Sequence, residues 1–310
     1  MTVADSGTSA PDHVIDVATN GITLSVRVAG SGPAVVLAHG FPETGYSWRH
    51  QVPALVAAGH RVIVPDMRGY GRSDRPAQVE SYSAENVGKD LIGLLDQLGE
   101  QEAVFVGHDW GAASVWPLAL SHPDRVRAVA GLSVPYGPPA PVAPTQIMRK
   151  RLGDDFYMIQ FQQQGPPEET LARDVRATMS ATMASIPLTV DVPFEAADLP
   201  PWLTPEELEV YVQAFEQSGF AGGLNYYRNI DRNWEHSVAL AGQTASAPSM
   251  FLTGSLDPVR SFMPSERIGE VFTHHRPEII IEGAGHWVQQ ERAREVNDAL
   301  LAFLASLENN

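Results

Sequence analysis

The chain has 310 residues, of which 44% are hydrophobic and 19% charged, and its formal net charge is −16. These values fit one large globular domain, or a core domain with an inserted subdomain. Such an acidic surface repels phosphate backbones and anionic lipid, so we expect neither nucleic acid nor membrane as a partner. The absence of cysteine excludes disulfides, thiolate metal sites and thiol catalysis.

Targeting and metal-binding signals are not found in the sequence. Residues 1–6 lack the basic and apolar segments of a secretory signal. No uncharged apolar stretch reaches the roughly 18 residues that span a bilayer, so we expect a cytoplasmic protein. His274 and His275 are adjacent rather than at helical metal-ligand spacing, and no carboxylate joins them in a ligand pattern. We therefore expect no metal.

The first part of the chain predicts a sheet with helices on both faces. Two strands, 13–18 and 22–28, flank Asn20-Gly21, a dipeptide typical of hairpin turns. The run Ala34–Ala38 is continuously apolar, as is typical of a strand buried on both faces of a parallel sheet. Strands and helices then alternate, which predicts an α/β protein with a mostly parallel central sheet. The alternating segments are 34–38, 47–58, 61–65, 84–99, 102–106, 111–121 and 126–132.

The pattern changes between residues 135 and 238, where no clear core strand occurs. This stretch begins rich in proline and then contains five helical segments, 145–152, 154–163, 168–184, 205–217 and 221–230. The α/β pattern returns with strand 249–253, helix 264–272, strand 278–281 and helix 287–306. We predict a core domain of residues 1–134 and 239–310, and a helical cap of residues 135–238 inserted after the sixth strand.

Residues 107–111 read Gly-His-Asp-Trp-Gly between a predicted strand and a predicted helix. In the nucleophile elbow, G-x-S-x-G, this context holds an attacking serine on a strained turn. Here the central residue is Asp109, whose carboxylate needs no base to act as a nucleophile and forms an alkyl ester with an electrophilic carbon. The alternative is an ordinary aspartate at a helix N-cap.

An ester on Asp109 must be hydrolysed, which requires a base and an acid that orients it. His286 follows strand 278–281, and Asp257 follows strand 249–253. The chain order of nucleophile, acid and histidine is that of α/β-hydrolase triads. All three positions follow predicted strands, where open α/β sheets place their sites. Taken singly, His286 also fits a structural loop histidine, and Asp257 fits a turn before proline.

A second loop contributes backbone groups. The segment 39–43, His-Gly-Phe-Pro-Glu, follows strand 34–38 and corresponds to the loop that supplies one oxyanion N–H group. The residue after the nucleophile supplies the other, so we assign the two donors to the backbone of Phe41 and Trp110. A tight turn with no catalytic part is the alternative for His39-Gly40. The sequence leaves open whether the Phe41–Pro42 bond is cis, and Glu43 receives no role.

Together with residues 66–73, these segments resemble the soluble-type epoxide hydrolases of the α/β-hydrolase superfamily. The matching segments span residues 35–290 and are specific for the branch with an aspartate nucleophile, although haloalkane dehalogenases share much of the set. The resemblance implies the α/β-hydrolase fold, a small-molecule epoxide and water as reactants, and no cofactor. A homodimer is a possible assembly.

The inserted segment distinguishes the two activities. Residues 155–162 and 223–229 resemble the two lid segments in which epoxide hydrolases carry tyrosines, which places that role on Tyr157 and Tyr227. A neutral phenol, with a pKa of ~10, can hydrogen-bond to a developing alkoxide and protonate it, whereas a halide needs no proton. Packing within the lid is the alternative for each tyrosine, and Tyr226 competes for the second role.

The sequence thus predicts an epoxide hydrolase that uses Asp109, His286, Asp257, Tyr157 and Tyr227. We expect the substrate pocket to be lined by His39, Pro42, Trp110, Tyr226 and Trp287. The main alternative is a haloalkane or haloacid dehalogenase with the same nucleophile. An esterase is disfavoured because no serine stands at position 109, and a non-catalytic ligand-binding protein is disfavoured because binding alone needs no triad.

Overall fold

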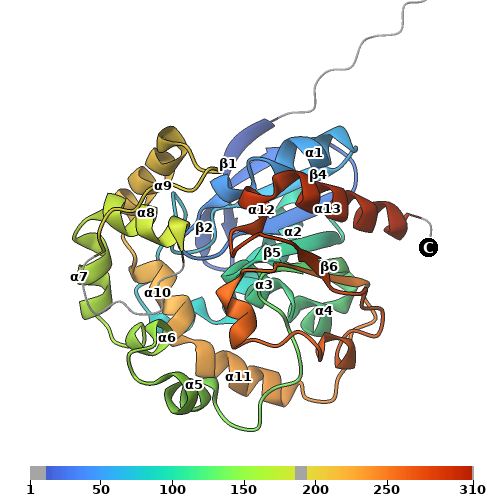
Figure 1. Ribbon diagram of the computed structural model, residues 1–310. Coiled ribbons are helices and arrows are strands. Elements are labelled where there is room, and N and C mark those ends of the chain that lie inside the picture. Colours follow the sequence, from blue (N-terminus) through green and yellow to red (C-terminus); the bar gives the residue numbers. More distant parts are fainter. Residues whose placement is uncertain (1–11, 186–193, 309–310) are drawn as a thin grey trace, which may run out of the picture.

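The structure is a computed structural model that describes residues 12–185 and 194–308. The expectation that residues 1–6 carry no signal lies outside this range. Among the residues described, no helix has the length and apolarity needed to cross a membrane. Figure 1 shows a central sheet with helices packed around it and a further group of helices at one edge.

Eight strands in the described residues form one sheet, in the order β1-β2-β4-β3-β5-β6-β7-β8. The β1–β2 and β2–β4 pairs are antiparallel, and the remaining pairs are parallel. This confirms the predicted hairpin and mostly parallel sheet. The strands are β1 Asp12–Thr19, β2 Ile22–Ala29, β3 Ala34–Ala38, β4 Arg61–Pro65, β5 Ala103–His108, β6 Val126–Leu132, β7 Ser249–Gly254 and β8 Ile279–Ile281.

The strand order reverses at β3, which lies between β4 and β5. Ligands bind outside the carboxyl ends of the strands at such a reversal, because the loops that leave neighbouring strands run in opposite directions and leave a crevice. The loop after β3 and the turn after β5 therefore face each other. These two segments carry the predicted oxyanion donor Phe41 and the predicted nucleophile Asp109.

Helices cover both faces of the sheet. Successive strand residues point to opposite faces, so Val35 packs with helices α1 (Gln51–Ala57) and α13 (Ala293–Leu307). Val36 packs on the other side with α2 (Ala84–Leu98) and α3 (Trp110–Val115). Helix α2 begins where the Ser83 side chain accepts the N–H of Asn86. The result is two buried apolar layers that fix the strands and leave their carboxyl ends free for a site.

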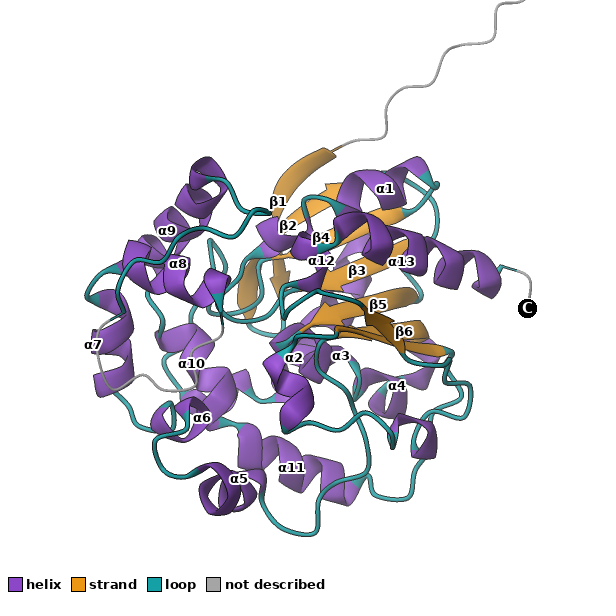
Figure 2. Cartoon of the chain, in the orientation of Figure 1, coloured by secondary structure: helices purple, strands orange, loops and turns teal. Residues whose placement is uncertain are grey.

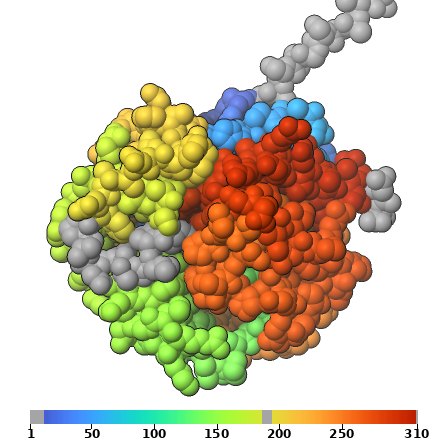
Figure 3. All heavy atoms as spheres, in the orientation of Figure 1, coloured from blue at the N-terminus to red at the C-terminus, as the bar shows by residue number. Residues whose placement is uncertain are grey.

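The helices between β6 and β7 form the part of the molecule with no orange strand in Figure 2. In the space-filling view of Figure 3, the green and yellow residues of this part adjoin the orange and red C-terminal residues. These helices are α5 Pro144–Leu152, α6 Tyr157–Gln160, α7 Pro166–Ala172, α8 Val175–Ala184, α9 Pro205–Ser218, α10 Ala221–Arg228 and α11 Ile230–Ala239. A helical segment after the sixth strand is therefore present as predicted.

Several helix predictions need correction. The predicted helix 264–272 is wrong, because only a 3-10 turn forms at Ile268–Glu270 and the chain next to it makes bridges to Ala245 and Ser249. The predicted helix 111–121 is interrupted at Pro117, which has no N–H to continue it. The predicted helix 154–163 shortens to α6, and α11 follows α10 without having been predicted. Two further predictions are each split in two: 168–184 into α7 and α8, and 287–306 into α12 (Val288–Glu291) and α13.

Candidate active site

Asp109 lies on a strained turn between β5 and α3. Its φ of 51° and ψ of −119° are conformations that non-glycine residues seldom adopt. Two glycines make the turn sterically feasible. A Cβ atom on Gly111 would lie 2.0 Å from the carbonyl oxygen of Ala38, and one on Gly107 would lie 2.4 Å from the carbonyl carbon of Gly111. The turn therefore presents the Asp109 side chain at the carboxyl end of the sheet.

The Asp109 carboxylate is held by the loop after β3. The backbone N–H of Phe41 donates to Oδ1 of Asp109 at 2.9 Å. Gly40 permits this approach, since a Cβ atom there would lie 2.3 Å from the same oxygen. The Phe41–Pro42 peptide bond is cis. Trp110 begins α3, so its N–H belongs to the first turn, where backbone donors have no acceptor within the helix.

His286 lies between two carboxylates. Its Nδ1 atom is 3.1 Å from both oxygens of Asp257, and its Nε2 atom is 3.5 Å from Oδ2 of Asp109. Asp257 is fixed in turn, because its Oδ1 accepts the N–H of Val259 at 2.9 Å. The structure thus brings together Asp109, Asp257 and His286, which the sequence places after three different strands.

The two carboxylates set the protonation of His286. Burial lowers the pKa of the imidazole, but the neighbouring charges of Asp257 and Asp109 outweigh burial and raise this pKa to about 10. Burial raises the pKa of Asp257, and His286 outweighs it, so the pKa of this carboxyl is lowered. While both carboxylates are ionised, His286 therefore holds a proton at neutral pH.

Tyr157 and Tyr227 line a small cavity together with Asp109 and His286. Tyr157 comes from α6 and Tyr227 from α10, and their ring centroids are 5.9 Å apart. Burial, and after it the charge of Asp109, raises the pKa of both phenols well above the ordinary value. Both are therefore neutral hydrogen-bond donors beside a carboxylate. The cavity is small and mostly apolar, and both phenols face the Asp109 carboxylate across it.

The cavity wall differs from the prediction in three residues. Pro42 and Trp287 line it as expected, whereas His39, Trp110 and Tyr226 do not. His39 is buried beneath the loop, where its Nε2 accepts the N–H of Met67 at 2.9 Å. The ring of Trp110 packs against that of Tyr227 at a centroid distance of 4.8 Å.

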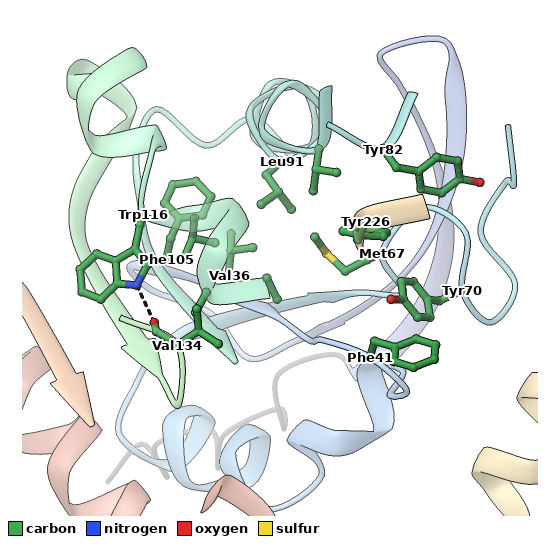
Figure 4. Close-up of a cluster of buried hydrophobic side chains, with 14 of the residues drawn as sticks. Val36, Phe41, Met67, Tyr70, Tyr82, Leu91, Phe105, Trp116, Val134 and Tyr226 are labelled. Atoms are coloured by element: carbon green, nitrogen blue, oxygen red, sulfur yellow. Dashed lines mark hydrogen bonds between the residues drawn. The ribbon is translucent and has the colours of Figure 1, made fainter. Parts of the chain in front are cut away.

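Tyr226 is held in the buried core, away from the cavity. Its hydroxyl donates to the carbonyl oxygen of Arg68 at 3.0 Å. Figure 4 shows its ring among buried side chains that include Met67, Tyr70 and Tyr82. Consecutive residues of a helix project about 100° apart, so Tyr226 points away from the cavity when Tyr227 points into it. Of the two tyrosines, Tyr227 therefore lines the cavity and Tyr226 does not.

Glu43, for which the sequence predicts no role, is fully buried below the site. Its Oε2 lies 2.7 Å from Nδ1 of His108, and its Oε1 accepts from the side-chain amides of Gln289 and Gln290 at 2.9 and 3.0 Å. Nε2 of His108 lies 2.8 Å from the carbonyl oxygen of His286. The sequence signal for Glu43 is its position in the segment 39–43, the loop expected to supply an oxyanion donor.

The cavity wall also contains four residues that were not predicted: Phe161, Leu171, Thr182 and Phe194.

Within the part of the chain that the structure describes, no three or more histidine and acidic side chains are arranged to hold a metal ion. The site itself offers the partly exposed carboxylate of Asp109, a buried histidine between this carboxylate and that of Asp257, and two neutral phenols.

Comparisons with known proteins agree with this geometry. A family model described as the alpha/beta hydrolase fold matches residues 33–293. Epoxide hydrolase A of Mycobacterium tuberculosis is 49% identical, over 94% of this chain and 96% of that protein. Epoxide hydrolase 1 of Siraitia grosvenorii is 40% identical, over 93% and 96%. The crystal structure of epoxide hydrolase A from Mycobacterium thermoresistibile has a TM-score of 0.91 and 47% identity, over 95% of this chain and 98% of that one.

The chain belongs to the epoxide hydrolase family of the α/β-hydrolase fold. The elbow, the loop after β3 and the late histidine loop of this family member all lie inside the matched range 33–293. The helical segment that carries Tyr157 and Tyr227 lies inside it as well.

Proposed function

We propose that this chain hydrolyses an epoxide to a vicinal diol through an ester on Asp109. Epoxide hydrolases of this fold generally react through an aspartate ester. The observation that supports the assignment here is the position of two buried, neutral phenols in the same cavity as a nucleophilic carboxylate. A halide would require no proton donor, whereas the oxygen of an opening epoxide does.

In the first step, the Asp109 oxygen that Phe41 does not hold attacks a ring carbon. The ring C–O bond breaks, and its electron pair stays on the oxygen. Tyr157 or Tyr227 gives that oxygen a proton and becomes a phenolate. The product is a hydroxyalkyl ester of Asp109, whose carbonyl oxygen is the Oδ1 atom next to the Phe41 N–H.

Ester formation also changes His286. The Asp109 carboxylate is one of the two charges that raise the pKa of His286, and esterification removes that charge. The imidazolium then gives its proton to the phenolate, which restores the neutral tyrosine. His286 is left as the free base that the second step requires, and Asp257 keeps its ring oriented.

In the second step, His286 takes a proton from water, and the hydroxide oxygen attacks the ester carbon. The negative charge develops on Oδ1, where the N–H groups of Phe41 and Trp110 stabilise it; one such donor is worth about 10²–10³ in rate. The intermediate collapses, and the departing oxygen takes the remaining water proton. The diol leaves, with Asp109 ionised and His286 protonated again.

Isotope transfer tests this mechanism. In a single turnover with excess enzyme in ¹⁸O-water, the label should enter the Asp109 carboxylate, and the His286→Gln variant should accumulate a protein adduct with the mass of the epoxide. Asp109→Asn should lose turnover. Label that appears only in the diol would rule out the ester, and halide release from a chloroalkane without diol formation would favour a dehalogenase.

The division of the chain remains a proposal. Residues 1–134 and 239–310 would form the core domain, and residues 135–238 the cap domain, because α5 to α11 lie between β6 and β7 and supply no strand to the sheet. A cytoplasmic location and a homodimer stay predictions from the sequence.

A further inference from the structure

Arg228 directly follows Tyr227, and its side chain crosses to the segment that carries Tyr157. Its Nε donates to the carbonyl oxygen of Phe161 at 3.1 Å, and its Nη2 donates to the carbonyl oxygen of Gln163. The same Nη2 lies 2.7 Å from the carboxylate of Glu168, and the Arg228 side chain is 5% exposed. One guanidinium group thus joins the end of α10 to the chain between α6 and α7 and to α7 itself.

The bonds of Arg228 act on a segment that is too short to hold itself in place. Helix α6 has four residues, and helices of this length are unstable without tertiary contacts. The side chain of Gln162 adds a second link, because it donates to the carbonyl oxygen of Tyr227 at 2.9 Å. The position of Tyr157 relative to Tyr227 therefore depends on hydrogen bonds between the two segments.

Helix α10 is attached to the core independently of Arg228. Gly222 lies against Gly69, where a Cβ atom on Gly222 would meet the Gly69 carbonyl oxygen at 2.5 Å. Asn229 donates to the carbonyl oxygen of Val79 at 2.6 Å, and Tyr226 donates to that of Arg68. Tyr227 is thus placed by contacts between α10 and the core. Arg228 adds one bond within α10, from Nη1 to Oδ1 of Asn225 at 2.9 Å, and its other bonds reach the α6 side.

Phe161 links the backbone contact to the phenols. Its ring centroid lies 5.6 Å from that of Tyr157 and 4.9 Å from that of Tyr227. Because Arg228 binds the carbonyl group of this same residue, a shift of the Phe161 backbone moves an aromatic ring that contacts both tyrosines.

We propose that Arg228 is a positioning residue that sets the placement of Tyr157 against Tyr227 over the epoxide oxygen. The proposal rests on the proposed function, because it concerns the step in which that oxygen is protonated. The second step uses His286, Asp257 and the loop after β3, none of which Arg228 contacts. Arg228 should therefore affect ester formation and leave ester hydrolysis largely unchanged.

Single-turnover kinetics of the two steps test this inference in Arg228→Met and Arg228→Lys. A misplacement of about 1 Å can cost ~10²-fold in rate, so we expect Arg228→Met to slow ester formation by about 10- to 100-fold. Ester hydrolysis should stay within about 3-fold of the unmodified protein. Lysine keeps a charge for Glu168 but has no planar fork for two carbonyl groups, so Arg228→Lys should recover part of the loss. The control is Arg232→Met, at an exposed arginine on α11, with both rates unchanged.

The outcomes separate the two proposals. Equal slowing of both steps, or a loss of thermal stability with normal ester formation in the folded fraction, would overturn the positioning role. If Arg228→Met does not fold, normal ester formation by Arg228→Lys would overturn it as well. An unmodified protein that forms neither ester nor diol would instead reject the proposed function, and the inference with it.

Discussion

The carboxylate of Glu43 lies 2.7 Å from Nδ1 of His108, and both side chains are fully buried. The N–H of Gly40 also donates to this carboxylate, at 3.1 Å. Burial raises the pKa of Glu43, but His108 outweighs it and the pKa is lowered. Through His108 the pair supports the main chain at His286, where the hydroxyl of Ser133 donates to the same carbonyl oxygen at 2.8 Å.

Glu43→Ala should destabilise the protein by about 3–5 kcal/mol, because it leaves His108 and two glutamine amides buried without their acceptor. Urea unfolding measures the change. Glu43→Gln is the matched control, since it keeps the shape and one acceptor oxygen, and its loss should be smaller. An alanine variant within 1 kcal/mol of the unmodified protein would contradict this account of the network.

Tyr227→Phe should slow ester formation by about 10²-fold, since it removes one of two proton donors to the departing oxygen. Rapid-quench measurement of the Asp109 ester gives this rate. Tyr226→Phe is the adjacent control: its hydroxyl binds the Arg68 carbonyl, so it should cost ~1 kcal/mol of stability with little change in rate. A rate loss in Tyr226→Phe with a normal rate in Tyr227→Phe would contradict the role of Tyr227 as proton donor.

The stability of the folded state should fall as pH rises from about 6.5 to about 10. The pKa of His286 is about 10 in the folded protein and 6.5 in its ordinary state, so the folded state binds this proton more tightly. That contribution is complete below pH 6.5 and is lost as pH approaches 10. Urea unfolding between pH 6 and 9 should therefore show a steeper decline for the unmodified protein than for His286→Gln. Parallel declines would show that His286 is not the group responsible.

Gly222→Ala should displace α10 from the core, because the added Cβ would lie 2.5 Å from the carbonyl oxygen of Gly69. Overpacking of this kind costs about 1–3 kcal/mol, and ester formation should fall because Tyr227 moves with its helix. Gly269→Ala is a suitable control, since no atom lies within 4 Å of its added Cβ. Thermal unfolding and single-turnover rates of the two variants measure both effects. Normal values for Gly222→Ala would show that α10 does not depend on close contact with Gly69.

Local sequence patterns were sufficient to predict the strands and to select the residues that meet at the carboxyl end of the sheet. The apolar runs at 34–38, 61–65 and 126–132 coincide with β3, β4 and β6. Asp109, Asp257 and His286 each follow a strand of the parallel part of the sheet, so the sequence places all three at the same edge, and the loops after β7 and β8 bring the last two to Asp109. The helix predicted at 264–272 failed because Ile268, Val271 and Phe272 have helical spacing, while the chain there bridges to the sheet edge instead.

Contacts between residues far apart in the chain could not be predicted from the sequence. Glu43 is 65 residues from His108 and 246 from Gln289, and Arg228 is 67 residues from Phe161. Nothing in the composition around these residues marks one as the partner of the other. The direction of a side chain was equally hidden at positions 226 and 227, where the two tyrosines differ only in the helical face on which they lie.

The Gly69–Gly222 contact also limits the positions at which substitutions can change the substrate selectivity of this enzyme. On α10, backbone lies against backbone, so almost any replacement at the contact disturbs Tyr227. Leu171 on α7 and Thr182 on α8 line the same cavity but take no part in that docking. Libraries randomised at these two positions should therefore yield altered selectivity among folded, active variants, whereas a library at position 222 should yield mostly inactive protein.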